Sequence, residues 1–399
     1  MLVNSSNLRR CNSTHLGLKT SGKLCRIHEH LRRINKPAVK SIQSSDGDII
    51  DCIHRHKQPA FNHPLLKKHK IQDLPERPSK FRPAPVNRTS FSVHAAQTWH
   101  LAGFCPEGTI PVRRTFAEDL MRADSPKRYG RKSHRAARFD QKPDVNGFGH
   151  EHAIAYVQGE EYYGAKATIN VWAPRIETLN EFSLSQLWVL SGSFDGSDLN
   201  SIEAGWQVSP ELYGDTRPRL FTYWTSDSYQ ETGCYNLLCS GFVQTNNKIA
   251  IGASISPVSE FADTQYDITI LIWKDPKEGN WWMEFADRTL VGYWPSELFT
   301  HLADHANMIE WGGEIVNTEA GGEHTSTQMG SGHFAEEGFG KASYFRNLEI
   351  VDSDNSLRGV SSMLTLAEHT YCYNIQNRYN IEWSNHFYFG GPGSNPRCP

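Results

Sequence analysis

The sequence predicts an all-β protein: an antiparallel β-sandwich preceded by a proline-rich segment that is mostly irregular with some β-structure. From about His150 onward, apolar residues alternate with polar ones in short segments, and Gly, Asn, Asp and Pro separate these segments. Such spacing is typical of sandwich proteins. Before His150, closely spaced prolines argue against long helices and central strands, because proline lacks the backbone donor. In the later part, only Trp294 to His305 has a helical pattern.

The individual elements follow from the same patterns. A strand is expected within Gly47 to His54, and a short helix over Thr115 to Arg122, with Thr115 as its cap. Further strands are expected in segments that begin at Ala165, Phe182, Ser201, Arg219 and Asp267, and over Trp281–Phe285, Ile309–Asn317 and Ala342–Ile350.

The length of 399 residues exceeds that of a usual single domain, and the charge is uneven along the chain. Basic residues outnumber acidic ones up to Val145, and the reverse holds afterwards. We expect residues 1–37 to be a disordered or misassigned start. Residues 38–143 are expected to form a prosegment with an exposed linker, and residues 144–399 the sandwich. A basic prosegment could dock on an acidic partner domain.

The cysteines indicate an oxidising compartment. Of the eight, Cys234 and Cys239 form one close pair, and Cys372 and Cys398 suggest a second local loop. A zinc site is disfavoured because no second close pair of Cys or His accompanies Cys234 and Cys239. A glycosylation sequon begins at Asn87. The cysteines and the sequon indicate a secreted, extracellular or vacuolar location, although no secretory leader is visible at the N-terminus. No apolar run of about 18 residues is present, so no membrane span is expected.

Two segments carry glutamates where a buried strand would disfavour charge. In "IEAGWQV", alternation puts Glu203, Gly205 and Gln207 on one face. In "IEWGGEIV", Glu310 and Glu314 share a face with a glycine between them, so periodicity cannot choose between these two. A solvent-exposed outer face of the sandwich would give the same alternating pattern, so that interpretation stays open for both segments.

If Glu203 met one of the other glutamates across a concave sheet, the two carboxyls could not both ionise easily. The ionised carboxyl could then take a proton from water, and the protonated one could polarise an amide carbonyl. Other hydrolase signatures, such as Gly-x-Ser-x-Gly and His-Glu-x-x-His, are absent from the sequence. For His150-Glu151-His152, a surface or hydrogen-bonding role is favoured over metal binding, and His324 and His333 are assigned to a loop.

The chain is also rich in tryptophan, with eleven in all. Most should be core residues, because aromatic side chains bury large apolar areas. Aromatic rings on a concave sheet can also stack against sugars or prolines. A non-catalytic extracellular sandwich that binds cell-wall carbohydrate or Pro-rich protein therefore stays open as an alternative.

Several segments together resemble the neprosin family of plant glutamic peptidases. The segment from Ala38 on, "KSIQSSDGDIIDCIH", and "CPEGTIPVRRT" resemble the family's activation peptide. The catalytic domain is resembled by "IEAGWQVSPELYGDTRPRLFTYWTSD", "TGCYNLLCSGFVQTN", "ILIWKDPKEGNWWM", "GYWPSELF", "EWGGEIVN", "HTSTQMGSGHF" and "GFGKASYFRN". The blocks occur in the family's order up to Pro399.

The resemblance implies a zymogen that is activated by acid and cleaves after proline, with a prosegment that blocks the cleft. It implies Glu203 and Glu314 as the catalytic pair, with Glu310 the less favoured second glutamate, and Gln186 and Gln207 as cleft residues. The expected partners are proline-containing peptides or proteins and the chain's own prosegment. The resemblance implies no metal, no cofactor and no binding of nucleic acid or a membrane. A monomer is expected.

Overall fold

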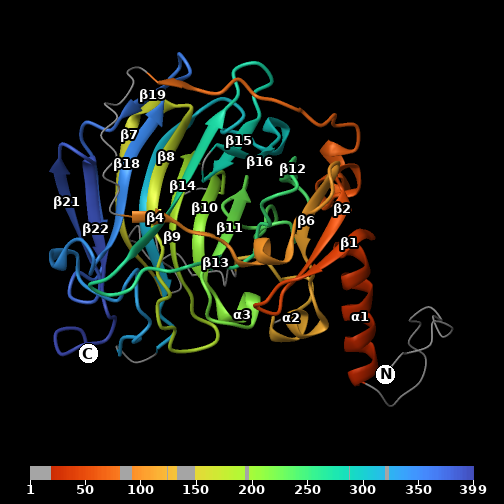
Figure 1. Ribbon diagram of the computed structural model, residues 1–399, viewed down its shortest axis with the longest axis horizontal. Coiled ribbons are helices and arrows are strands. Elements are labelled where there is room, and N and C mark those ends of the chain that lie inside the picture. Colours follow the sequence, from red (N-terminus) through yellow and green to blue (C-terminus); the bar gives the residue numbers. More distant parts are fainter. Residues whose placement is uncertain are drawn as a thin grey trace.

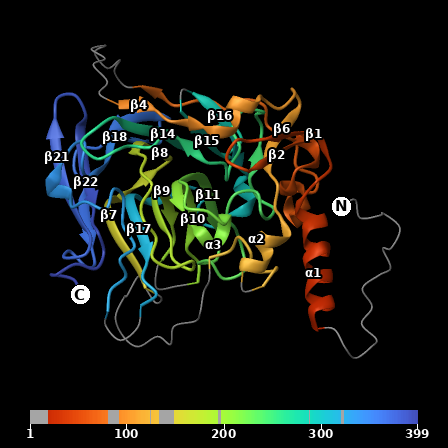
Figure 2. The same cartoon turned by 60° about the horizontal axis from the view of Figure 1, so that its bottom comes forward.

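The computed structural model describes residues 19–80, 92–123, 125–132, 149–193, 197–286, 288–319 and 323–399. Two β-sheets pack face to face in the sandwich that the sequence predicts, and the N-terminal part covers one end and one side of it (Figures 1 and 2). Within the described residues, no helix is long and apolar enough to cross a membrane.

The first sheet carries the candidate site. Its strands are all antiparallel to their neighbours. In spatial order they are β11 (Arg219–Thr225), β10 (Asn200–Val208), β9 (Ser183–Ser191), β17 (Ala306–Val316), β7 (His150–Tyr162) and β20 (Leu364–Ala367).

The second sheet is larger and mixed. Its main path is β12 (Val243–Gln244), β16 (Thr289–Trp294), β15 (Trp281–Phe285), β14 (Gln265–Lys274), β8 (Gly164–Asn170), β18 (Ser343–Val351), β19 (Ser356–Gly359) and β3 (Ser79–Lys80). Off this path, β22 (Ser384–Gly390) pairs with β18, β21 (Asn374–Asn380) with β22, and β4 (Ser92–His94) with β14. A separate pair joins β5 (Ala96–Gln97) to β13 (Ile255–Ser256).

The core lies between the two sheets and is rich in tryptophan, as the sequence predicts. Trp206, Trp281 and Trp311 are fully buried in it. The indole N–H of Trp206 donates to the carbonyl of Asn170 at 2.8 Å, which satisfies its polar atom inside the core. Because neighbouring residues of a strand point to opposite faces, Glu203 and Glu314 project from the other side of this sheet.

The N-terminal part of the chain has its own small sheet in the prosegment and two helices, one before the prosegment and one within it. The sheet consists of β1 (Ala38–Gln43), β2 (Ile49–His54) and β6 (Thr109–Arg113), and a disulfide joins Cys52 to Cys105. The helices are α1 (Lys19–Ile34) and α2 (Ala117–Arg122). A further short helix, α3 (Pro210–Tyr213), follows β10.

Three expectations for local structure were wrong. Residues 19–34 form α1 where disorder was expected, because Ile27 is buried in a cluster with Leu120 of α2. The helix expected over Thr115 to Arg122 forms as α2, but its cap is Phe116 rather than Thr115, and Asp119 accepts the backbone N–H of Phe116. The helix expected from Trp294 is the end of β16 followed by a single 3-10 turn over Ser296–Leu298.

The prosegment is held to the sandwich by buried ion pairs. Arg219 of β11 is buried and donates to Asp48 of the prosegment at 2.6 Å and to Asp215 at 2.6 Å. Asp48 also accepts from Arg113 at 2.8 Å. On the second sheet, Arg77 binds both carboxylate oxygens of Glu284. The prosegment therefore supplies both acidic and basic partners to these ion pairs, whereas the sequence suggested a basic prosegment on an acidic domain.

We predict that Asp48→Ala lowers the free energy of unfolding by about 3 kcal/mol, because it leaves Arg219 and Arg113 buried without one of their carboxylates. Urea denaturation at pH 7.5, followed by tryptophan fluorescence, measures this. The control is Asp73→Ala, which removes the exposed partner of Arg55 and should cost less than about 1 kcal/mol. Equal losses in both variants would contradict a buried anchor at Asp48.

Candidate active site

The strand register brings the candidate residues into three adjoining rows on one sheet face. Residues directly opposite one another in an antiparallel pair share a face. In these rows, taken across β10, β9 and β17, the residues are Glu203, Trp188 and Glu310; then Gly205, Gln186 and Gly312; then Gln207, Leu184 and Glu314.

Glu203 is completely buried, and each of its oxygens has a partner. Oε1 accepts hydrogen bonds from Ser201 at 2.9 Å and from the Tyr229 hydroxyl at 2.8 Å. Oε2 accepts from the ammonium of Lys132 at 2.7 Å. The charge of this buried carboxylate is therefore balanced by a lysine at the end of the prosegment.

Lys132 sits in a cage made of the carboxylate and two aromatic rings. Its Nζ lies 5.2 Å from the centre of the Tyr223 ring and 4.9 Å from that of Tyr229. Its backbone N–H donates to the Tyr223 hydroxyl. Burial alone would lower the pKa of Lys132, but the negative charges of Glu203 and Glu314 raise it above its ordinary value. The lysine is thus held as a cation.

Glu314 is also buried, and its positive neighbours come from β7. His150 Nδ1 lies 2.5 Å from Oε1, and His152 Nε2 lies 3.9 Å from Oε2. The amide of Gln186 donates to Oε2 at 3.4 Å. Burial would raise the pKa of Glu314, but the charges of Lys132, His150 and His152 and the hydrogen bond to His150 lower it far below its ordinary value. Glu314 is therefore an ionised carboxylate.

Glu310 has a different environment although it shares the face of Glu314. Burial, together with the negative charges of Glu203 and Glu314, raises the pKa of Glu310 to about 7 against the positive charge of His152. The two glutamates that the sequence left undecided are therefore distinct: one is held ionised and the other holds its proton below neutral pH.

In the described part of the chain, no hydrogen bond joins Glu203 directly to Glu314. They lie two strands and two rows apart, with Gly205, Gln186 and Gly312 between them. A Cβ at Gly205 would lie 2.0 Å from the carbonyl oxygen of Ser185, so a side chain at this position would force the backbone apart. In the middle row, therefore, the positions on β10 and β17 carry no side chain between the two carboxyls.

Of the two candidate glutamines, only Gln186 contacts a candidate carboxylate. Its Oε1 is buried without a hydrogen-bond partner, so an acceptor is available beside Glu314. Gln207 lies in the same row as Glu314 but donates instead to the Tyr213 hydroxyl of α3 at 2.9 Å. Gln207 therefore binds α3 at the edge of this sheet face and does not contact either candidate carboxylate in the described part of the chain.

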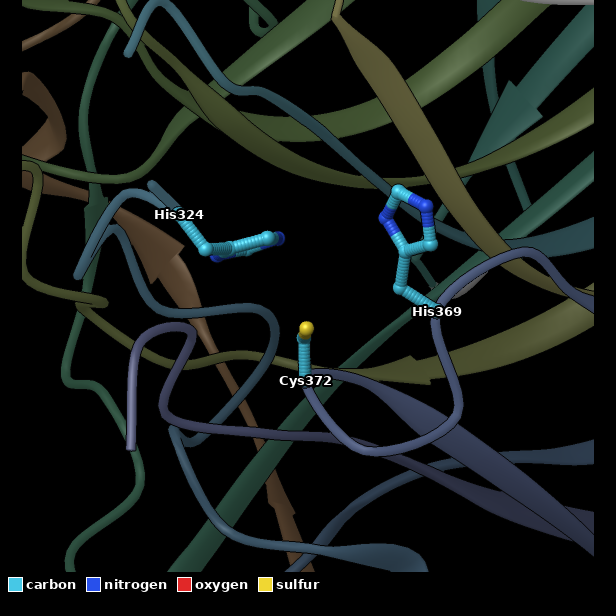
Figure 3. A group of neighbouring side chains, drawn as sticks. All are labelled: His324, His369 and Cys372. Atoms are coloured by element: carbon cyan, nitrogen blue, oxygen red, sulfur yellow. The ribbon is translucent and has the colours of Figure 1, made fainter. Parts of the chain in front are cut away.

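The remaining sequence expectations concern cysteines, sugar and metal. Disulfides join Cys234 to Cys239 and Cys372 to Cys398. Asn87 and residues 133–148 lie outside the described residues. His324, His369 and Cys372 approach one another as ligands of a metal would (Figure 3), but the sulfur of Cys372 is bonded to Cys398 and cannot act as a thiolate ligand.

Sequence reasoning missed several members of the site, above all Lys132, His150, His152 and Tyr229. A surface or hydrogen-bonding role was expected for the two histidines, and both do form hydrogen bonds, but their partners Glu314 and Glu368 were not predicted. Alternation along a β-strand puts both histidines on one face. Their register against β17 places His152 opposite Glu314. The alternation was readable in the sequence, whereas the register was not.

Two solved structures are similar to this chain at low level. One is a scytalido-glutamic peptidase with a peptide-based transition-state analogue, 10% identical, with a TM-score of 0.34 over 61% of this chain and 98% of that chain. The other is SCP-B, a member of the eqolisin family of peptidases, in complex with the tripeptide Ala-Ile-His, 10% identical, with a TM-score of 0.31 over 60% and 97%. At this degree of similarity, neither contributes to the assignment of the site.

The family matches cover most of the chain. Residues 41–156 match the neprosin activation peptide, and residues 179–392, more than half of the chain, match the neprosin domain. An activation peptide followed by a neprosin domain is the organisation of a peptidase zymogen. The chain belongs to the neprosin family.

Proposed function

We propose that this chain is a secreted or vacuolar zymogen of a glutamic endopeptidase that hydrolyses peptide bonds after proline at acidic pH. The observation that carries the proposal is a pair of buried carboxyls, Glu203 and Glu314, on one sheet face, with a prosegment lysine bound to the first. The three described disulfides are consistent with an oxidising compartment.

Glu314 is the general base in this proposal. Its oxygens face two histidines and the Gln186 amide. Although burial would raise its pKa, the charge of Lys132, followed by the contacts to His150 and His152, lowers this pKa. It takes a proton from a water molecule while the water oxygen bonds to the carbonyl carbon of the substrate. When the C–N bond then breaks, Glu314 returns that proton to the leaving amine.

Glu203 is the acid that polarises the carbonyl. Once Lys132 leaves, the hydrogen bonds from Ser201 and Tyr229 remain, and both donors are neutral. A buried carboxyl that loses its counter-ion takes up a proton more readily. Protonated Glu203 can donate to the carbonyl oxygen as negative charge develops on it.

Acid would release the prosegment by neutralising its carboxylate anchors. Burial would raise the pKa of Asp46, but hydrogen bonds from Ser254 and Ser44 lower it. A carboxyl with a lowered pKa stabilises docking fully above its unfolded value, near 4, and this contribution is lost as the pH falls through the lowered value.

Proline recognition is assigned to the aromatic part of this face. Trp188 lies between Glu203 and Glu310 in its row, whereas Trp206 and Trp311 point into the core. An indole beside the carboxyls offers a flat apolar surface for a pyrrolidine ring. Proline-containing peptides are therefore the proposed substrates, and the prosegment is the first occupant of the cleft.

The central test uses a quenched proline-containing peptide with acid-treated protein. We predict that Glu203→Gln and Glu314→Gln each lower kcat at least about 1,000-fold, because each variant removes a proton transfer that the other carboxyl cannot replace. Glu310→Gln is the matched control on the same strand and should retain activity within about tenfold. Absence of activity in the unaltered protein would instead favour the non-catalytic binding sandwich.

A second prediction concerns latency. Lys132→Met leaves Glu203 buried without its cation, so the prosegment should dock less tightly. At pH 5.5, acid maturation followed by mass spectrometry should be at least about tenfold faster, which corresponds to about 1.4 kcal/mol. Lys127→Met, at an exposed position of the same segment, should mature at the normal rate. Equal rates in the two variants would remove Lys132 from the blocking contact.

A third prediction follows from the pKa of Glu310, about 7. Because this value is raised by burial, ionising Glu310 destabilises the fold, and the cost grows as pH rises from about 4.5 to about 7. Glu310→Gln should therefore increase the free energy of unfolding by on the order of 2 kcal/mol at pH 8 and much less at pH 5.5. Urea denaturation at both pH values measures this. A pH-independent difference would show that Glu310 does not titrate in this range.

A further inference from the structure

We infer that Glu368 is a positioning residue of the proposed peptidase site, which holds His152 oriented and positively charged against Glu314. This inference rests on the proposed function. Glu368 follows the last residue of β20, and none of the sequence patterns singled it out. It binds the backbone and the ring of His152 and would act through this histidine.

The contacts of Glu368 fix both the backbone and the ring of His152. Its Oε2 accepts the backbone N–H of His152 at 2.6 Å, and its Oε1 lies 3.1 Å from the ring Nδ1. With Nδ1 protonated toward Glu368, the opposite ring nitrogen, Nε2, faces Glu314 at 3.9 Å. A histidine between two carboxylates is stabilised as a cation, and the ring cannot turn without losing the bond to Glu368.

The position of Glu368 follows from strand register. β20 pairs with β7 as far as Ala367, which lies opposite Ala153. Just beyond this end, Glu368 contacts His152 and His369 contacts Glu151. Because adjacent strand residues face opposite sides, the first pair faces the candidate site and the second faces away from it.

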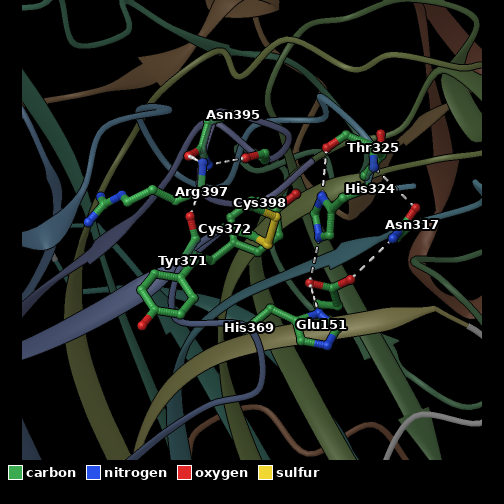
Figure 4. Close-up of a disulfide and its surroundings, with 12 residues drawn as sticks. Glu151, Asn317, His324, Thr325, His369, Tyr371, Cys372, Asn395, Arg397 and Cys398 are labelled. Atoms are coloured by element: carbon green, nitrogen blue, oxygen red, sulfur yellow. Dashed lines mark hydrogen bonds and ion pairs between the residues drawn. A yellow bond between two sulfur atoms is a disulfide. The ribbon is translucent and has the colours of Figure 1, made fainter. Parts of the chain in front are cut away.

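The pair on the opposite face is also a glutamate with a histidine, but here β7 supplies the glutamate, Glu151, and the segment after β20 supplies the histidine, His369. Glu151 Oε2 lies 2.8 Å from His369 Nδ1 and 2.9 Å from His324 Nε2 (Figure 4). Figure 4 also shows the Cys372–Cys398 disulfide beside these side chains. The backbone N–H of Cys372 donates to the carbonyl of His369, so the disulfide loop anchors the segment that carries Glu368.

The groups around His152 decide the sign of the expected pH effect. Glu314 and Glu310 approach from β17 and Glu368 from the segment after β20, while His150 lies on the same strand and contacts Glu314. Burial would lower the pKa of His152, but the hydrogen bond to Glu368 and the three carboxylates raise it. Without the charge of Glu368, His152 would lose its proton at a lower pH and would hold Glu314 less firmly.

Glu368→Gln tests this in acid-matured protein, since the amide oxygen can still accept the backbone N–H of His152 but the charge is gone. We expect the upper limb of the kcat/KM–pH profile to move down by about one pH unit, with KM unchanged. Glu368→Asp should restore the limb at least in part. The matched control is Glu151→Gln, which removes the same charge from the pair on the opposite face and should leave the profile in place while lowering Tm.

A second readout does not depend on activity. In full-length protein with 13C-labelled histidine, NMR titration above pH 5.5 should show a lower midpoint for His152 in Glu368→Gln than in the unaltered chain, and an unchanged midpoint in Glu151→Gln. If both variants lower Tm but neither shifts the kcat/KM–pH profile or the His152 midpoint, Glu368 only stabilises the fold and the inference is wrong. If the unaltered protein lacks activity but the midpoint moves, the proposed function fails while the Glu368–His152 pairing stands.

Discussion

The organisation of this molecule depends on the cost of burying carboxylates. Glu203 and Glu314 lie on a sheet face that is closed to water, and an isolated buried charge of this kind would cost several kcal/mol. Each therefore has a close partner from a different part of the chain: Glu203 binds the ammonium of Lys132, and Glu314 lies 2.5 Å from His150 of β7. The first partner lies in the prosegment, whereas the second belongs to the sheet itself. In the proposed function, departure of the prosegment would therefore remove the partner of Glu203 but not that of Glu314.

The same constraint explains the docking of the prosegment. Its small sheet contributes Asp48 to a buried arginine of β11, and its strands β3 and β4 extend the second sheet of the sandwich. The prosegment thus completes the fold of the zymogen in addition to covering the face. Carboxylates lie on both sides of the interface, so the proposed activation by acid would not require a prosegment with a net positive charge.

The sequence predicted the sandwich well and the candidate site in part. Alternating segments located β9, β10, β11 and β17 of the first sheet and β8, β14, β15 and β18 of the second, but not the other strands. Glycine-flanked strand positions pointed to Glu203 and to Glu310 or Glu314, and only the family resemblance favoured Glu314. The missing members, Lys132 and His152, became site residues only through contacts with residues distant in the chain. Lys132 stands in a basic run, where each lysine looks solvated, and strand register cannot be read from one strand alone. α1 was missed because Ile27 is a rare buried residue in a basic, polar helix.

The Glu–His pairs between β7 and the residues after β20 show how one stretch of backbone can serve stability and chemistry together. The dipeptides Glu151-His152 and Glu368-His369 bind each other reciprocally, and strand alternation sends one pair to the disulfide side and the other to the site. Displacing the segment after β20 would therefore alter both pairs at once. Glu314 is held in place by a histidine whose own position depends on a loop closed by Cys372 and Cys398, so the geometry of the candidate base depends on the C-terminal disulfide loop.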